Sequence, residues 1–508
     1  MSSAANVIDP SVPARARAGV TTHYLRYATG NVLVMVAGFI SFPIMTRLLD
    51  TSQYGIFGYF DAWLLILAAL FKLGAQHTIL RFYPHAGGRS ALAPFGANHI
   101  LAPFAVSSVL WMLGVVAYAV IVFSTPAEAA TVGWIMLMLL LPTMWISYVN
   151  AFAFAEERSD VSVRISVGQR WCETACILLV VYFVSRSTLG VYLARLGVAL
   201  TFAIGLTFWL RRNVPLRARY FDASEYVDGL RYGVPLVLNE IAATLLAFAD
   251  RLMLRLLLVD FAAVGVYTIG YGLALNINNL FNLALYNAYT QVSVREFETN
   301  GAAAVLRTKR AVLHGLVYFC AMMIVGLVVV GADALLLMAG NDKTASAPVF
   351  VLIGIVYTLD GLLSICGAGL LLLKRSRSVL MLTLSAAVLN VILNFFLIPR
   401  FGVMGAAYSS MLSFTALNTA RYLTCPRELR ALPDARATVI AVALGALCVA
   451  IAHFTQLGGV QSHALRILML AALLLIGFVA PAFMLDGDLR AAALRHFASV
   501  RQRTHPTR

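Results

Sequence analysis

Apolar stretches of about 20 residues recur along the whole chain, and this feature most limits what the chain can fold into. A helix needs roughly 20 apolar residues to cross the hydrocarbon core of a bilayer. The composition agrees, because 61 % of the residues are hydrophobic and only 12 % are charged, against about 25 % charged in soluble domains. We therefore predict an all-α polytopic membrane protein with about fourteen transmembrane helices. The predicted spans are 27–48, 55–79, 95–123, 132–154, 165–184, 188–210, 228–250, 262–288, 309–331, 347–372, 379–398, 402–423, 436–455 and 464–485.

The basic residues lie in short segments between these stretches. The formal net charge of +15 would suggest nucleic-acid binding in a soluble chain. Lys and Arg are instead concentrated in alternate loops, as in membrane proteins, where such loops face the cytoplasm. We therefore predict that both termini are cytoplasmic and that there is no nucleic-acid partner. The six cysteines show no metal-ligand spacing, so we expect neither a metal site nor a cofactor.

A weak internal repeat appears at a shift of 210 residues, because Asp50 and Gly55 correspond to Asp260 and Gly265. Duplicated helix bundles are common in transporters. The repeat predicts two pseudo-symmetric six-helix lobes in parallel orientation, followed by an extra helix pair. The expected segments are a cytoplasmic tail at 1–24, an N-lobe at 25–212, a C-lobe at 226–424, accessory spans at 433–486 and a basic cytoplasmic tail at 487–508.

Several motifs, in this order and spacing, are similar to those of a known family. They are Pro43-Ile-Met-Thr-Arg47, Tyr54-Gly55, Gly74-Ala-Gln-His-Thr-Ile-Leu-Arg81, Tyr232-Gly-Val-Pro235, Asp250-Arg251 and Leu389-Asn390-Val-Ile-Leu-Asn394. From about residue 24 to 485, the chain resembles the polysaccharide transporter family of lipid-linked oligosaccharide flippases. This family, of O-antigen and exopolysaccharide type, belongs to the multidrug/oligosaccharidyl-lipid/polysaccharide superfamily.

The resemblance implies a function that we take as an expectation. The cargo would be a polyprenyl-pyrophosphate-linked oligosaccharide, moved by alternating access from the cytoplasmic to the outer leaflet of a bacterial inner membrane. H⁺ or Na⁺ would be candidate coupling ions, and polysaccharide polymerase or export proteins candidate partners. The alternatives are a multidrug/ion antiporter of the same superfamily and a membrane polysaccharide ligase or polymerase. The short loops argue against an enzyme, because such ligases and polymerases need a large outer loop.

Basic residues within or beside the spans are the candidates for binding a pyrophosphate headgroup. An ionised side chain is costly at bilayer depth and needs a partner or a watery cavity. Arginine suits phosphate because its planar fork matches the phosphate oxygens. The candidates are Lys72, Arg170 and Arg195 in the cavity, with Arg26 and Arg81 at its cytoplasmic mouth. Alternatively, Arg170 only pairs with Glu173, and Arg26 and Arg81 only anchor the chain at the interface.

Acidic residues in the spans are candidates for ion coupling or gating. They are Glu240, Asp360 and Asp61, together with the Asp250-Arg251 pair at the end of the seventh span. Desolvation favours the protonated form of a buried carboxyl group, which suits proton binding. The alternatives are a structural carboxyl group for Glu240 and Asp360, and an ion pair at a helix end for Asp250-Arg251.

The eighth span is rich in amides, and Asn276, Asn279 and Asn287 fall near one helical stripe. Amides that face lipid would be unsatisfied, so the stripe should face protein or water. We expect glycan contact there, with hydrogen bonding between helices as the alternative. The accessory spans are apolar on every side, and the resemblance suggests that they form a groove for the polyprenyl tail. Their alternative role is packing.

Overall fold

The computed structural model describes residues 20–84, 88–279, 284–455 and 462–491, and over these residues the chain is helical with no strand. The N-terminal half contains α1 (Val20–Leu48), α2 (Thr51–Phe71), α3 (Ala75–Phe82), α4 (Gly88–Phe95), α5 (Ala102–Ile121), α6 (Ala127–Ala155), α7 (Ser159–Phe183) and α8 (Thr188–Asn213). The rest contains α9 (Ala223–Leu258), α10 (Phe261–Asn278), α11 (Ala284–Ala339), α12 (Ala347–Cys366), α13 (Ser376–Phe401), α14 (Val403–Thr424), α15 (Ala435–Phe454), α16 (His463–Leu474) and α17 (Ala480–Leu485). Short π-helical segments join α4 to α5 and α16 to α17.

Each predicted span overlaps a described helix, and the prediction of an all-α polytopic membrane protein is confirmed. By length and composition, eleven helices of the described residues can cross a membrane. The predicted count of about fourteen also includes α7, α9 and α14, which are 25, 36 and 22 residues long but less apolar. Their polar residues include Asp250 and Ser410, both buried against other helices. Polar residues turned toward protein lower a helix's hydropathy without exposing charge to lipid.

The second predicted span is not a single helix. The range 55–79 is divided, because α2 ends at Phe71 and α3 begins at Ala75. Leu73 and Gly74 between them have positive φ angles of 46° and 78°. A Cβ atom at Gly74 would lie 2.6 Å from the Gly233 carbonyl oxygen, so this position must be glycine for α9 to approach.

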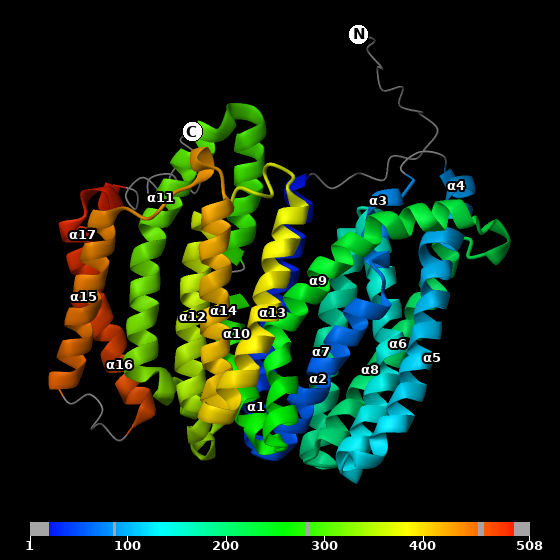
Figure 1. Cartoon of the computed structure of the whole chain (residues 1–508), viewed down its shortest axis with the longest axis horizontal. Coiled ribbons are helices and arrows are strands. Elements are labelled where there is room, and N and C mark those ends of the chain that lie inside the picture. The colour runs from blue at the N-terminus through cyan, green and yellow to red at the C-terminus, as the bar shows by residue number, and fades with distance from the viewer. Residues whose placement is uncertain (1–19, 85–87, 280–283, 456–461, 492–508) are drawn as a thin grey trace, which may run out of the picture.

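The predicted range 262–288 begins on α10, which ends at Asn278, and reaches α11, which begins at Ala284; residues 280–283 lie outside the described part of the chain. Within α11 the chain turns at Gly301, where φ is 75° and ψ is −173°. This turn lies at the upper end of the bundle in Figure 1. Of the predicted amide stripe, Asn276 lies on α10, Asn279 follows the end of α10, and Asn287 lies on α11.

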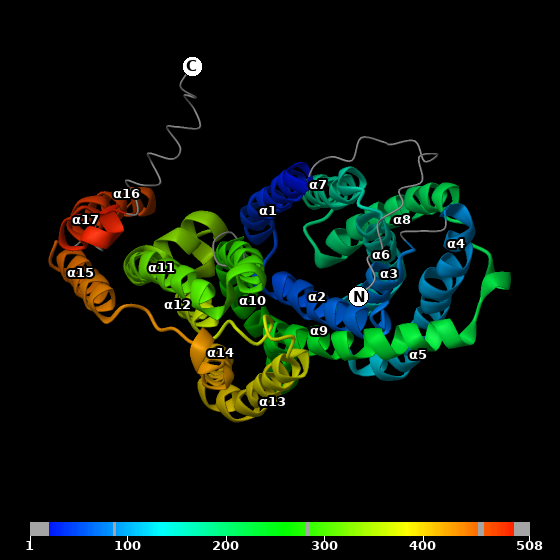
Figure 2. The ribbon, with the colours of Figure 1, turned by 90° about the horizontal axis from the view of Figure 1, so that it is seen from above.

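The helices form two groups with α9 running between them. Helix α9 crosses from the α4–α5 side at one end of the bundle to the middle of the other end (Figures 1 and 2). On its way it packs against α2 and α3 of the first group and against α13 of the second. Direct contacts between α2 and α10 complete the junction. The exact residue limits predicted for the two lobes stay predictions.

The repeated Asp and Gly residues lie at this junction. Asp50 caps α2 by accepting a hydrogen bond from the Gln53 backbone nitrogen at 2.7 Å, and Asp260 caps α10 in the same way. Just beyond the caps, a Cβ atom at Gly55 would lie 1.8 Å from the Phe261 carbonyl oxygen. A Cβ atom at Gly265 would meet a backbone carbonyl oxygen of α2 at the same 1.8 Å. The repeat thus brings two equivalent helix starts into backbone contact with each other.

The accessory helices α15–α17 lie on the outer side of α11 (Figure 1). Polar contacts fasten them to α11 at two levels. Asp486, after α17, lies 3.0 Å from His314 Nε2, and Asp333 accepts from Arg466 Nη1 at 2.8 Å. His314 and Asp333 are separated by 19 residues of α11, or about 29 Å at 1.5 Å per residue, close to the hydrocarbon thickness of a bilayer. The start of α1 and the short helix α17 lie at the same end of the bundle (Figure 1).

Candidate functional site

A cluster of one arginine and two carboxylates lies inside the first helix group. Arg195 on α8 donates from Nη1 to Asp61 Oδ1 of α2 at 2.8 Å. Its Nε lies 2.7 Å from Glu173 Oε1 of α7. The three side chains are 14–28 % exposed, so water screens them little. The Arg195 guanidinium also lies 5.4 Å from the centre of the Tyr192 ring. This Arg195 cluster joins three helices and carries one negative charge in excess.

The Arg195 cluster changes the interpretation of Arg170. The alternative that Arg170 pairs with Glu173 is wrong, because Glu173 pairs with Arg195 instead. Among the residues that the structure describes, Arg170 forms neither an ion pair nor a hydrogen bond, and it is half-buried. A buried or half-buried cation without a partner is costly and is typical of a functional position.

Arg170 lies where α7, α1 and α10 meet. A Cβ atom at Gly38 of α1 would lie 3.6 Å from Arg170 Nη2 and 3.8 Å from Asn276 Oδ1. The predicted headgroup residue Arg170 and the predicted glycan residue Asn276 therefore both border the small space beside Gly38. Any larger residue at position 38 would fill that space.

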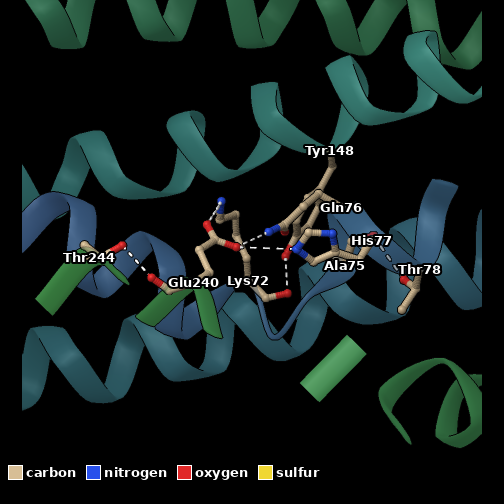
Figure 3. Close-up of polar contacts among 8 residues, drawn as sticks. All are labelled: Lys72, Ala75, Gln76, His77, Thr78, Tyr148, Glu240 and Thr244. Carbon is tan, nitrogen blue, oxygen red and sulfur yellow. Dashed lines mark hydrogen bonds and ion pairs between the residues drawn. The ribbon is translucent and has the colours of Figure 1, made fainter. Parts of the chain in front are cut away.

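Lys72 and Glu240 were predicted to serve different purposes, yet the structure pairs them (Figure 3). Lys72 Nζ lies 3.2 Å from Glu240 Oε1. Gln76 Nε2 donates to Glu240 Oε2 at 2.6 Å, and His77 Nε2 lies 3.6 Å from the same oxygen. Lys72 directly follows α2, and Gln76 and His77 lie in the first turn of α3, whereas Glu240 is on α9. This pair therefore joins the first helix group to the crossing helix.

Two of the three predicted cavity cations are paired with carboxylates. Lys72 pairs with Glu240, and Arg195 pairs with Asp61 and Glu173, whereas Arg170 forms no ion pair with a described residue. Arg26 and Arg81, predicted to lie at the cavity mouth, are both exposed. Their positions are compatible with either of the two predicted roles.

A second polar cluster, around Asp250, lies inside the C-terminal helix group. Asp250 is completely buried and accepts hydrogen bonds from the Tyr267 hydroxyl, from Ser410 Oγ at 2.6 Å and from Asn394 Nδ2 at 2.6 Å. No described cation pairs with it. The Asn394 Oδ1 atom, also buried, has no hydrogen-bond partner. The cluster thus presents several oxygens from α9, α10, α13 and α14 around one carboxylate.

Asp250 and Arg251 do not form the predicted ion pair at a helix end. Helix α9 continues to Leu258, two turns beyond them, and no ion pair joins the two residues in the described structure. Arg251 is 5 % exposed, and its guanidinium packs over the rings of Phe248 and Tyr271 at 4.7 and 5.0 Å. Consecutive residues on a helix point in different directions, which separates the two charges.

The remaining candidates are less enclosed. Asp360 on α12 accepts a hydrogen bond from Asn418 Nδ2 of α14 at 2.8 Å, as expected for a hydrogen-bonded structural carboxyl group. Asn279 is exposed at the end of α10. Asn287 lies on α11, with its side chain outside the described part, and its predicted glycan contact stays a prediction.

Sequence reasoning missed Lys309 as a buried residue, because it lies between Arg307 and Arg310 in one of the basic segments. Lys309 is completely buried on α11. Its Nζ donates to the carbonyl oxygens of Cys366, Ala368 and Leu429 at 3.3, 2.6 and 2.5 Å. Cys366 ends α12, where carbonyl groups lack helical partners. The sequence could not predict the burial of Lys309, because its hydrogen-bond acceptors are backbone carbonyl oxygens, which every residue type has.

The comparisons with known proteins agree with this architecture. A model of the polysaccharide biosynthesis protein family matches residues 22–289. The chain belongs to this family. Comparison with curated protein sequences gives no match.

Solved structures of other proteins share this fold. The inward closed conformation of the lipid II flippase MurJ aligns with a TM-score of 0.71 at 12 % identity, covering 92 % of this chain and 99 % of that one. An inward-facing multidrug resistance MATE transporter of the MOP superfamily aligns with a TM-score of 0.58 at 13 % identity, covering 85 % and 99 %. A MOP superfamily transporter from Pyrococcus furiosus aligns at 0.54 and 12 % identity, covering 86 % and 97 %. At such identities the likeness establishes the MurJ- and MATE-like fold of this family member, and nothing about its cargo.

Proposed function

We propose that this protein is a flippase for a polyprenyl-pyrophosphate-linked oligosaccharide, which it moves from the cytoplasmic to the outer leaflet of a bacterial inner membrane. The match to the polysaccharide biosynthesis family over residues 22–289 carries this proposal. The two-group helical fold, shared with a lipid II flippase, supports it. Surface polysaccharide, of the O-antigen or exopolysaccharide type, is the product that this cargo would serve.

In this proposal the headgroup binds first at Arg170. This guanidinium has no protein anion to displace, whereas Lys72 and Arg195 are already neutralised by carboxylates. Charge-assisted hydrogen bonds from arginine to phosphate are short and strong. Asn276, which also borders the small space beside Gly38, would then contact the first sugar or the phosphate. The headgroup's own negative charge would compete with Glu240 for Lys72 as the helix groups move.

The coupling ion binds, in this proposal, at Asp250. A buried carboxylate without a counter-cation favours either a proton or a hard cation bound by oxygen ligands. The Ser410 hydroxyl, the Tyr267 hydroxyl and the unpartnered Asn394 carbonyl oxygen can provide such ligands. Asp250→Asn should abolish ion-dependent transport. Dependence of wild-type transport on Na⁺ at constant pH would assign the ion as Na⁺, and dependence on pH alone would assign it as a proton.

The polyprenyl tail follows the accessory helices α15–α17. Their outward residues include Val439, Leu468 and Ile476, which are 66–71 % exposed. A long apolar tail gains by lying on such a surface while the headgroup passes through the protein. Truncation after Leu432 removes the surface but leaves Leu429, the Lys309 acceptor, in place. If the shortened protein accumulates in the membrane and still exports normally, the tail does not need these helices.

The test of the function is the leaflet distribution of the cargo. Deletion of the gene should cause a lipid-linked oligosaccharide to accumulate on the inner leaflet, and re-expression should clear it. Arg170→Gln should fail to clear it at a normal protein level, because Arg170 forms no hydrogen bond or ion pair with a described residue that the substitution would remove. Arg400→Gln, an exposed arginine in the last turn of α13, serves as the matched control and should restore export.

A multidrug/ion antiporter is the second candidate, because MATE transporters share the fold. The ion pair of Lys72 with Glu240 and the acidic excess of the Arg195 cluster are compatible with it. Increased drug sensitivity of the deletion strain without accumulation of lipid-linked sugar would favour the antiporter. A polysaccharide ligase or polymerase is the least supported candidate, because the family and fold are those of transporters.

A further inference from the structure

A groove on the outside of the N-terminal helix group is separate from the polar clusters described above. It encloses about 770 Å³ between α5, α6 and α8 and the segment that follows α8. No residue of the Arg195 cluster or of the Lys72–Glu240 pair lines it. Its volume is in the range of sites that hold a ligand, roughly 300–1,000 Å³.

The wall of the groove is apolar over most of its length. Phe104, Leu141 and Leu200 are among the residues that form it. Polar side chains of the lining are bonded within the protein, since Trp145 Nε1 donates to Thr207 Oγ1 at 2.8 Å and Asn213 Nδ2 donates to the Trp209 carbonyl oxygen at 2.7 Å. An apolar wall whose polar side chains are already bonded favours a hydrocarbon chain over a sugar, which would need hydrogen-bond partners.

The mouth of the groove is strongly basic. Arg211, Arg212 and Arg217 line it, all three are exposed, and none forms an ion pair with a described residue. No acidic residue lines the groove. Along α8 the distance from Leu200 to Arg211 is 11 residues, or about 16 Å, which is close to half of a hydrocarbon core of about 30 Å. The arginines therefore lie at headgroup level when the apolar wall lies at acyl-chain level.

We propose that this groove binds an anionic glycerophospholipid of the bilayer, with an acyl chain along α8 and its phosphate at Arg211, Arg212 and Arg217. Charge complementarity favours an anionic over a zwitterionic headgroup, and basic pockets between membrane helices are suited to such lipids. Through Arg217, the bound phosphate also contacts the segment that connects α8 to the crossing helix α9. This lipid site is independent of the cargo.

The test compares two lipids with the same acyl chains on the purified full-length protein in detergent. Phosphatidylglycerol should bind more tightly than phosphatidylcholine and should raise the thermal unfolding midpoint. The triple variant R211Q/R212Q/R217Q should weaken phosphatidylglycerol binding at least about tenfold and should bind both lipids equally. The control K374Q/R375Q/R377Q removes three exposed cations at the same end of the bundle, outside the groove, and should change binding less than about twofold.

A second variant tests the apolar wall with the arginines intact. Ala203→Phe places a ring in the groove and should weaken the binding of both lipids. If the triple variant and its control lose the same amount of affinity for phosphatidylglycerol, the effect is due to diffuse surface charge and the proposed site is refuted. Equal binding of the two lipids by the wild type would also overturn it. So would tighter binding of undecaprenyl phosphate than of phosphatidylglycerol, because the occupant would then be a cargo-type lipid.

Discussion

The contact between Gly55 and the start of α10 gives the sharpest stability prediction. Gly55→Ala would place a Cβ atom 1.8 Å from the Phe261 carbonyl oxygen and 2.9 Å from the Gly265 backbone nitrogen. Ordinary contacts of Cβ atoms begin at 3.4 Å, so the two helices must separate by about 3.4 − 1.8 = 1.6 Å. Both groups belong to backbone, which cannot move aside as a side chain can.

The cost of this separation exceeds the benefit of the new residue. Overpacking in a well-packed interior costs typically about 1–3 kcal/mol, whereas alanine gains about 1 kcal/mol over glycine in a helix. We expect a net loss of stability and a lower apparent Tm. The same change at Gly197 on α8 meets no atom within 4 Å and should leave the Tm unchanged or raised.

The assay is the fraction of folded, monodisperse protein after heating, measured by fluorescence-detected size-exclusion chromatography for both variants and the wild type. Since both variants make the same chemical change, helix propensity and expression effects are matched. A Gly55→Ala protein as stable as the Gly197→Ala protein would refute the backbone contact between α2 and α10. Export should fall with Gly55→Ala, because the two helix groups meet at this contact.

Three further outcomes follow from the polar contacts and the helix ends. Arg195→Met should destabilise the protein by about 3 kcal/mol, because two poorly hydrated carboxylates lose their partner; an unchanged Tm would contradict a structural role for the cluster. The charge reversals Lys72→Glu and Glu240→Lys should each lower export, and the double variant should recover part of it, as measured by inner-leaflet accumulation of the cargo. Impermeant thiol reagents should label Asp342→Cys but not Ser376→Cys in intact cells, both in a cysteine-free background; labelling of the second alone would invert the predicted orientation.

The membrane class and most helix positions could be predicted from sequence because they depend on local properties. An apolar stretch of sufficient length forms a helix in a bilayer, whatever lies beside it. The repeat of Asp50 and Gly55 at Asp260 and Gly265 could also be found in the sequence, but the contact between the two repeated segments could not. That the two glycines meet in space depends on how α2 and α10 pack.

The predicted boundaries were wrong where tertiary contacts interrupt an apolar stretch. The range 55–79 was predicted as one helix, yet the chain breaks at Leu73 and Gly74 as α9 passes. Asp250 was placed at a helix end because the Asp250-Arg251 pair interrupts the apolar stretch, but α9 continues through a leucine-rich segment to Leu258. Polar side chains of other helices satisfy the buried Asp250 carboxylate, so it need not lie at the membrane surface.

The sequence by itself determined that this chain is a helical membrane protein, and it identified the ionisable residues that need an explanation at bilayer depth. Only the tertiary structure decided how those residues are paired. Lys72 and Glu240 are 168 residues apart, and Arg195 and Asp61 are 134 residues apart. Helical periodicity relates residues three or four positions apart and carries no information on such distant partners. Coulombic pairing depends on distance in space, so the packing of the helices alone left Arg170 without a partner.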